Sequence, residues 1–160
     1  MTKLTVREQA LRNLKQLFVA MEAGQPVTDP YTITWSLVER FDVGDRARGK
    51  NFVMQIFDLR ETKIPRIGQM EPTLRVFLEW KALCPAECDP SEFANDVLGQ
   101  IQRRIREDIT LTDTVINVIE TGNEITIDDF ADRHIEGNVS INILYKHAEN
   151  DPREYLTGSI

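Results

Sequence analysis

The sequence predicts an α+β fold: a mostly antiparallel sheet with two helices packed on one of its faces. Two stretches carry apolar residues at the spacing of an amphipathic helix, one near the N-terminus and one in the middle of the chain. Other stretches alternate apolar and polar residues, as strands with one buried face do. The expected order is helix, three strands, helix, three strands, with the second helix lying across the sheet.

The second helix is expected to begin at Asp89, whose carboxylate can accept hydrogen bonds from the free N–H groups of the first turn. Pro90 suits the first helical position, and Glu92 stands where a capping box places its acid. Apolar residues then recur on one face of the helix: Phe93, Val97, Leu98, Ile101, Ile105 and Ile109.

The first helix is expected over residues 5–23. Thr5 and Glu8 fit a capping box, and Gly24 is a natural stop at the C-terminal end. The apolar stripe that would pack on the core consists of Val6, Ala10, Leu14, Leu17, Phe18 and Met21.

The strands are expected from period-two alternation and from runs that are apolar on both faces. They fall at 31–37, 52–59, 74–80, 115–119, 124–127 and 139–145. Gly122 and Asn123 are expected to make the turn between the fourth and fifth of these strands. The two-sided strand at 52–59 is expected either at the centre of the sheet or against a neighbouring subunit.

Segments 42–51 and 60–71 are expected to be long loops on one side of the sheet, where contacts to partners tend to lie. The first could touch phosphate, meet an acidic protein surface, or simply be solvated; it lacks the interleaved aromatic residues of a nucleic-acid site. The candidate subunit or partner interface combines basic residues of both loops with two strand aromatics: Arg46, Arg48, Lys50, Phe57, Lys63, Arg66 and Phe77.

Length and composition predict one α+β domain over residues 1–147 and a C-terminal tail or arm over 148–160. A chain with 41% apolar and 28% charged residues resembles ordinary soluble proteins, and the net charge of −7 argues against a dedicated DNA binder or a membrane-surface protein. The N-terminus lacks a signal-peptide core, so we expect a cytoplasmic protein with free thiols at Cys84 and Cys88.

The sequence offers little catalytic chemistry, and we expect neither an enzyme nor a cofactor. It lacks a glycine-rich phosphate loop and the common hydrolase and zinc motifs. His147 and Asp151 could mimic an acid/base pair but have no nucleophile in view. An acid-rich run could bind Mg²⁺ or Ca²⁺, although its spacing is not that of a calcium loop and a solvated connection is the simpler interpretation: Asp128, Asp129, Asp132, His134 and Glu136.

The central part of the chain resembles the tail terminator family of long-tailed bacteriophages. In that family a helix ends in a short D-x-T-L-G-G turn, followed by a strand, a glycine and a closing strand of the type I-x-I-x-Y. Here the turn reads Asp108-Ile109-Thr110-Leu111, with Thr112-Asp113 where the two glycines usually stand. The resemblance is sharpest in the residues 93–98, Ile101, Ile105, 108–111, 115–119, Gly122 and 141–145.

This resemblance implies a structural protein of the virion tail, assembled in the host cytoplasm. Such terminators form a hexameric ring that caps the tail tube, ends its polymerisation and joins it to the head-completion or connector proteins. A contractile tail would add the sheath as a partner, and DNA would pass through the lumen without specific binding. The family motif brings no catalytic or metal residues. The alternatives are another neck or head-tail connector ring protein, a small metal-binding domain, or a general interaction module.

Overall fold

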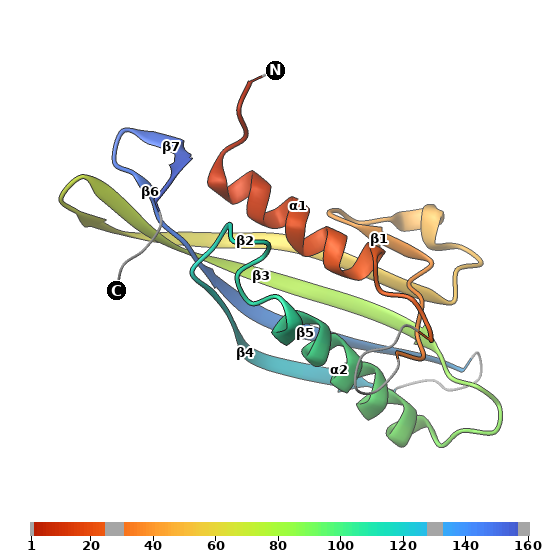
Figure 1. Ribbon diagram of the computed structural model, residues 1–160. Coiled ribbons are helices and arrows are strands. Elements are labelled where there is room, and N and C mark those ends of the chain that lie inside the picture. Colours follow the sequence, from red (N-terminus) through yellow and green to blue (C-terminus); the bar gives the residue numbers. More distant parts are fainter. Residues whose placement is uncertain (1, 25–30, 128–132, 157–160) are drawn as a thin grey trace.

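The computed structural model describes residues 2–24, 31–127 and 133–156. Two α-helices, one short 3₁₀ helix and seven strands follow one another in these residues (Figure 1). Their bounds are α1 (Val6–Val19), β1 (Leu37–Glu39), η1 (Gly44–Ala47), β2 (Phe52–Arg66), β3 (Gln69–Leu83), α2 (Pro90–Glu107), β4 (Asn117–Thr126), β5 (His134–Leu144), β6 (His147–Ala148) and β7 (Asp151–Tyr155).

The strands form one sheet in the order β1-β2-β3-β5-β4, which confirms the predicted α+β fold with a mostly antiparallel sheet. Only β1 runs parallel to its neighbour β2; the other pairings are antiparallel. The short strand β6 extends the ladder of β3, and β7 pairs with β6. Helices and strands therefore follow one another roughly in the predicted order.

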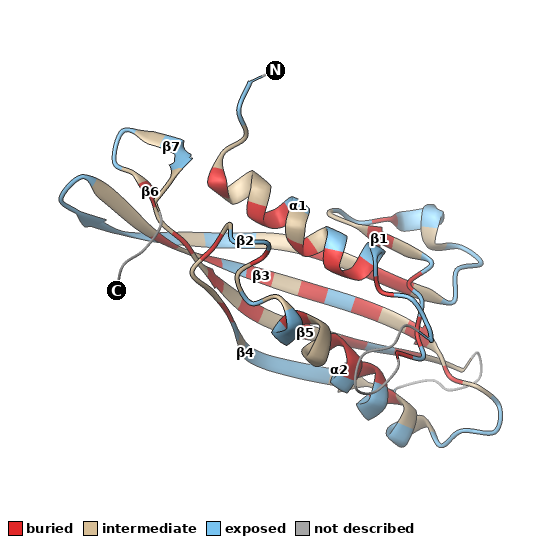
Figure 2. Cartoon of the chain, in the orientation of Figure 1, coloured by how far each residue is buried: buried red, intermediate tan, exposed pale blue. Residues whose placement is uncertain are grey.

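Both helices lie on the same face of this sheet, with α2 across β5 and β4 as the sequence predicts (Figure 1). The core lies between the two layers. Alternate residues of β3 point into it, and Leu74, Val76, Leu78 and Trp80 are fully buried while Arg75 and Glu79 are exposed (Figure 2). This alternation is the physical reason that a period-two pattern identifies the strand.

The start of α2 is the one that the sequence predicts. The carboxylate of Asp89 accepts hydrogen bonds from the backbone N–H groups of Ser91 at 2.9 Å and Glu92 at 3.1 Å. The helix ends at Glu107, so Ile109 lies beyond it and is 43% exposed instead of continuing the buried stripe.

The start of α1 is also as predicted, because the Thr5 side chain accepts from the Glu8 N–H at 3.1 Å. The helix ends earlier than expected, with Ala20 as its C-cap. Gly24 has a φ of +79° and serves a different turn, in which its N–H donates to the Tyr31 carbonyl at 2.6 Å. The predicted stop at Gly24 is therefore wrong by one helical turn.

The strand expected at 31–37 is mostly not a strand. Residues 31–35 do alternate between buried and exposed side chains, but only Leu37–Glu39 pairs in the sheet. The segment instead runs along the helices: the Thr32 N–H donates to Gln100 of α2, and Thr34 accepts from the Ala23 N–H just after α1. Alternating burial thus arises from contact with helices, without a strand partner.

The prediction of a second loop at 60–71 is wrong, because this segment forms the turn of the long β2–β3 hairpin and the strand ends beside it. Strands β2 and β3 stay paired up to Arg66 and Gln69, and Gly68, with a φ of +74°, supplies the tight turn. The loop 42–51 lies at the opposite end of β2 and contains η1. The two segments therefore lie at opposite ends of the β2–β3 pair, not on one side of the sheet (Figure 1).

The turn expected at Gly122-Asn123 is a β-bulge. Strand β4 continues through it, and its pairing with β5 shifts register between Glu120 and Gly122. One strand thus replaces the two expected at 115–119 and 124–127. The described part of the C-terminal segment, residues 148–156, includes β7, which packs beside α1.

Candidate subunit interface

The sheet face turned away from α1 and α2, here called the open face, carries the two aromatic residues that the sequence predicts at an interface. Phe57 and Phe77 are direct cross-strand partners in the β2–β3 ladder, and both are half-buried. Ser140 of β5 is the next residue in the same row. The sheet thus brings together two aromatic rings that lie 20 positions apart in the sequence.

One end of the open face is covered by the loop that contains η1. Val43 of this loop and Val53 of β2 are both buried, and they line a small cavity of about 110 Å³. Arg46, predicted at the interface, makes an ion pair with Glu39 at 3.0 Å and lies over the Phe41 ring. Arg48 and Lys50 are exposed nearby. These three basic residues therefore lie together on the loop before β2, apart from Phe57 and Phe77.

The other predicted cations lie on the hairpin arm, defined as residues 59–71. Lys63 pairs with Glu61 at 3.3 Å and Arg66 with Glu71 at 3.4 Å. Ile64 and Ile67 are exposed on the same arm, Ile67 completely. The arm thus presents two exposed isoleucines beside paired charges.

The sheet ends in two strand edges without a strand partner among the described residues. One is β4, the last strand of the sheet. The other is the part of β2 beyond Gln55, because β1 pairs only with Val53, Met54 and Gln55. Unpaired edges offer a row of N–H and C=O groups to another chain.

A β-bulge interrupts the exposed edge of β2. The pairing with β3 shifts between Asp58 and Glu61, which leaves Leu59 and Arg60 outside the ladder. Both are exposed, Leu59 by 54% of its surface. Bulges of this kind re-aim side chains at sheet edges.

On the opposite side of the molecule, a groove of about 400 Å³ runs between α2 and the edge strand β4. Its apolar lining comes from Ile105 and Val118, which are both buried. Ile119 also borders the groove and is 44% exposed, but its side chain points to the open face because Val118 and Glu120 on either side of it face α2. Glu120 and Arg106 are the charged residues in its lining. Gln102 donates to both carboxylate oxygens of Glu120 at 3.0 Å, which fixes the position of that charge.

A charged network ties α1 to the bulge in β2. Arg7 pairs with Asp58 at 2.6 Å and with Glu61 at 3.7 Å, while Arg40 bridges Asp58 and Glu8. Burial alone would raise the pKa of Asp58, but the hydrogen bond from Arg7 and the charges of Arg7 and Arg40 lower it overall.

Glu61 also accepts a hydrogen bond from the hydroxyl of buried Tyr145. Burial and this bond raise the pKa of Tyr145 above its ordinary value. The bulge is thus held from α1 on one side and from β5's C-terminal end on the other, so its geometry is fixed.

The turn after α2 contains an unusual run of left-handed residues. Leu111, Thr112 and Asp113 have φ values of 46°, 59° and 57°, which L-residues adopt at a cost. The Asp108 carboxylate accepts from the Thr112 N–H at 2.8 Å, and Asn13 of α1 donates to the Leu111 carbonyl at 2.9 Å. Side-chain bonds therefore stabilise a backbone conformation that glycine would adopt freely.

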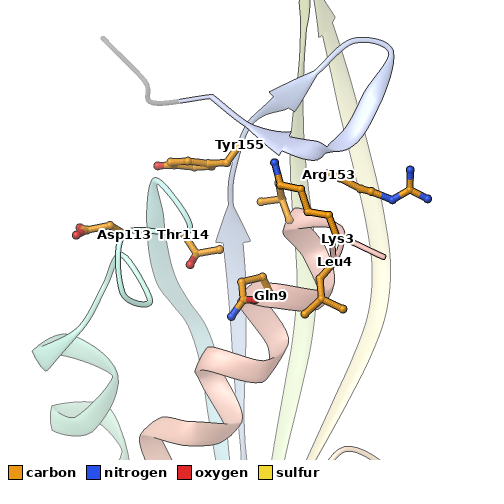
Figure 3. A pocket seen from close by; sticks show the side chains of 8 residues that line it. Lys3, Leu4, Gln9, Asp113, Thr114, Arg153 and Tyr155 are labelled. Atoms are coloured by element: carbon orange, nitrogen blue, oxygen red, sulfur yellow. The ribbon is translucent and has the colours of Figure 1, made fainter. Parts of the chain in front are cut away.

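A second cavity, of about 230 Å³, lies where this turn, the start of α1 and the C-terminal hairpin meet (Figure 3). Its lining mixes acidic, basic and apolar groups, a pattern that selects no ligand class: Lys3, Leu4, Val6, Gln9, Asp113, Thr114, Arg153 and Tyr155. We assign no function to it.

The candidates for metal and acid/base chemistry gain no support. Asp128, Asp129 and Asp132 lie outside the described residues. Within residues 2–24, 31–127 and 133–156, no group of three or more His, Cys, Asp or Glu side chains is arranged to hold a metal ion. His147 is buried, and its Nδ1 lies 2.7 Å from the Ala148 carbonyl oxygen. Among the described helices, none is long and apolar enough to span a membrane.

The sequence missed the residues that stand out most at the edges of the sheet. In the sequence, Leu59 ends an expected strand, Arg60 begins an expected loop, and Ile119 belongs to an expected strand. Their exposure depends on a register shift and on β4 being the last strand, neither of which local spacing encodes.

Comparison with known proteins adds no relative. The chain matches no protein-family model and no curated protein.

Proposed function

We propose that this protein is a ring-forming structural protein of a bacteriophage tail, a tail terminator that caps the tube and joins it to the head-completion proteins. The observation that carries the proposal is the pair of unpaired edges at the two sides of one sheet. Along the order β2-β3-β5-β4 each neighbour is antiparallel, so β4 runs antiparallel to β2. Copies related by rotation can therefore meet edge to edge, a heterologous contact that can close into a ring.

The turn after α2 supports the same proposal. In the family that the sequence resembles, two glycines follow the D-x-T-L segment. The corresponding Thr112 and Asp113 both have the left-handed conformation that glycine favours. The departure from the family motif thus keeps the backbone shape that the motif would specify.

The ends of the sheet also suit a protein that has two different partners. The basic group Arg46, Arg48 and Lys50 lies at one end of β2, and the hairpin arm lies at the other. In a ring whose axis follows the strands, one set would face the tail tube and the other the connector.

A phage lacking the gene tests the proposal. We expect overlong tails without heads, and we expect the purified protein to bind the open ends of isolated tail tubes as a six-fold ring in electron micrographs. Normal-length tails that fail only to join heads would favour a different neck ring protein. Normal, infectious particles from the deleted phage would refute both interpretations.

A further inference from the structure

The two edges of the sheet can be compared row by row, because the ladders are continuous from β2 to β4. Arg75 of β3 pairs with Asn142 of β5, which pairs with Ile119 of β4. On its other side, β3 pairs with β2, and there Arg75 lies opposite the bulge. The bulge falls between the pairs Asp58–Val76 and Glu61–Leu74. Leu59 and Arg60 therefore lie in the same row of the sheet as Ile119.

This shared row matters in a closed ring, because neighbouring copies are then related by rotation without a rise along the axis. With the axis along the strands, residues in one row of the sheet lie at one height. The bulge of one copy then meets the edge of β4 around Ile119 of the next.

The chemistry of the two surfaces is complementary at this height. Leu59 is an exposed apolar side chain, and the edge of β4 offers Ile119, which is 44% exposed. Arg60 stands beside Leu59, and Glu120 lies in the groove lining beside Ile119. Among the described residues, the Glu120 carboxylate accepts from the neutral amides of Gln102 and Asn123, so its charge can still pair with a cation from a neighbouring copy. Arg106, at the α2 side of the groove, carries the same charge as Arg60.

We infer that the β2 bulge of one copy docks against the β4 edge of the next, with Leu59 on Ile119 and Arg60 paired with Glu120. This inference rests on the proposed ring and names the contact that builds it. The network from Arg7 and Tyr145 holds the bulge in place before assembly, so little order is lost on docking.

Cysteine cross-linking tests the contact directly. In a Cys88→Ser background, which removes the exposed native thiol, Leu59→Cys is combined with Ile119→Cys and treated with a short bis-maleimide on tube-bound protein. We expect a covalent ladder ending in a closed species. The matched control combines Ile64→Cys with Ile119→Cys; Ile64 lies on the same exposed edge but in a different row, so we expect no ladder.

A charge exchange tests the ion pair. Arg60→Glu or Glu120→Arg alone should reduce ring formation by about tenfold, and the double variant should restore it. Thermal unfolding of each variant shows whether the chain itself still folds. If rings form on tube ends but the Leu59/Ile119 ladder is absent and Arg60→Glu has no effect, the contact is wrong while the proposed function stands. If the unaltered chain forms no ring and binds no tube ends, both fail.

Discussion

At the scale of single residues, the tightest constraint is the contact between Trp80 and Gly137. The two are cross-strand partners, and the indole lies directly against the glycine. A Cβ built at Gly137 would stand 2.4 Å from Trp80 Cζ2 and 2.8 Å from the Glu124 carbonyl oxygen. Glycine is thus required here by space rather than by backbone conformation.

Gly137→Ala should therefore lower the free energy of unfolding by about 2 kcal/mol, the usual cost of overpacking a core. The matched control is Gly122→Ala, because a Cβ there meets no atom within 4 Å. Chemical denaturation of both variants measures the difference. Equal stabilities for the two variants would contradict the packing argument.

Thr112→Gly should have the opposite effect and raise the free energy of unfolding by about 1 kcal/mol, because it relieves a β-branched residue with positive φ. The backbone N–H that donates to Asp108 at 2.8 Å is kept, and only the longer bond from the Thr112 hydroxyl to Asp108, at 3.2 Å, is lost. Thr110→Gly, at a position without positive φ and with side-chain bonds to Asp108 and Asp113, should destabilise instead. Thermal or urea unfolding distinguishes the two, and a loss of stability in Thr112→Gly would disprove the strain.

At the scale of elements, α1 is attached to the sheet by charge as well as by its apolar stripe. The stripe packs on the core through buried Ala10, Leu14 and Phe18. Arg7, one turn earlier, reaches Asp58 and Glu61 of β2. The helix therefore fixes both the core and the bulge that we place at the subunit contact.

Arg7→Met should lower the free energy of unfolding by about 1 kcal/mol, because Asp58 and Glu61 each lose one of their two cations and keep only Arg40 and Lys63. Arg12→Met is the matched control: Arg12 pairs with Glu8 alone and is largely exposed, so we expect a change near zero. Urea titrations at neutral pH measure both. Equal effects would mean that the network at the bulge adds nothing beyond an ordinary surface pair.

At the scale of the whole molecule, several ion pairs link the helix layer to the sheet and make stability depend on pH. The hydrogen bond and charge of Lys15 lower the pKa of Glu39. Burial opposes, but bonds from Arg40 and Arg12 outweigh it and lower the pKa of Glu8. Asp58 follows the same pattern through Arg7. Ionisation of each of these three carboxylates therefore stabilises the folded protein.

A carboxylate whose pKa is lower in the folded than in the unfolded chain stabilises the protein at any pH above its unfolded-state pKa. That contribution is lost as the pH falls through the folded-state pKa. We therefore expect stability to be steady near neutral pH and to decline below about pH 4, the unfolded range of these acids. Denaturant midpoints between pH 7 and pH 3 measure the decline. It should be smaller in Arg7→Met, and a midpoint independent of pH over this range would refute the argument.

Much of the fold could be predicted because the signals are local. The Asp89 cap and the stripe of α2 are written in neighbouring residues, and so is the alternation of β3. The errors share a cause. Alternation over 31–35 reflects packing on helices, the arm at 59–71 stays paired although its residues resemble a loop, and Gly122 marks a bulge instead of a turn. In each case local composition and spacing do not show which segment the residues contact: α2 for 31–35, the adjacent strand for the arm, and β5 for Gly122.

The sequence by itself determined the α+β class, the helix starts and most of the apolar stripe of each helix, because spacing and capping act within one or two turns of chain. It also placed Phe57 and Phe77 among the candidate contacts. Only the tertiary structure decided that these two are partners, that β4 and the far half of β2 are the free edges, and that Leu59 shares a row with Ile119. Strand order and register depend on contacts between distant segments, and those contacts exist only once the chain has folded.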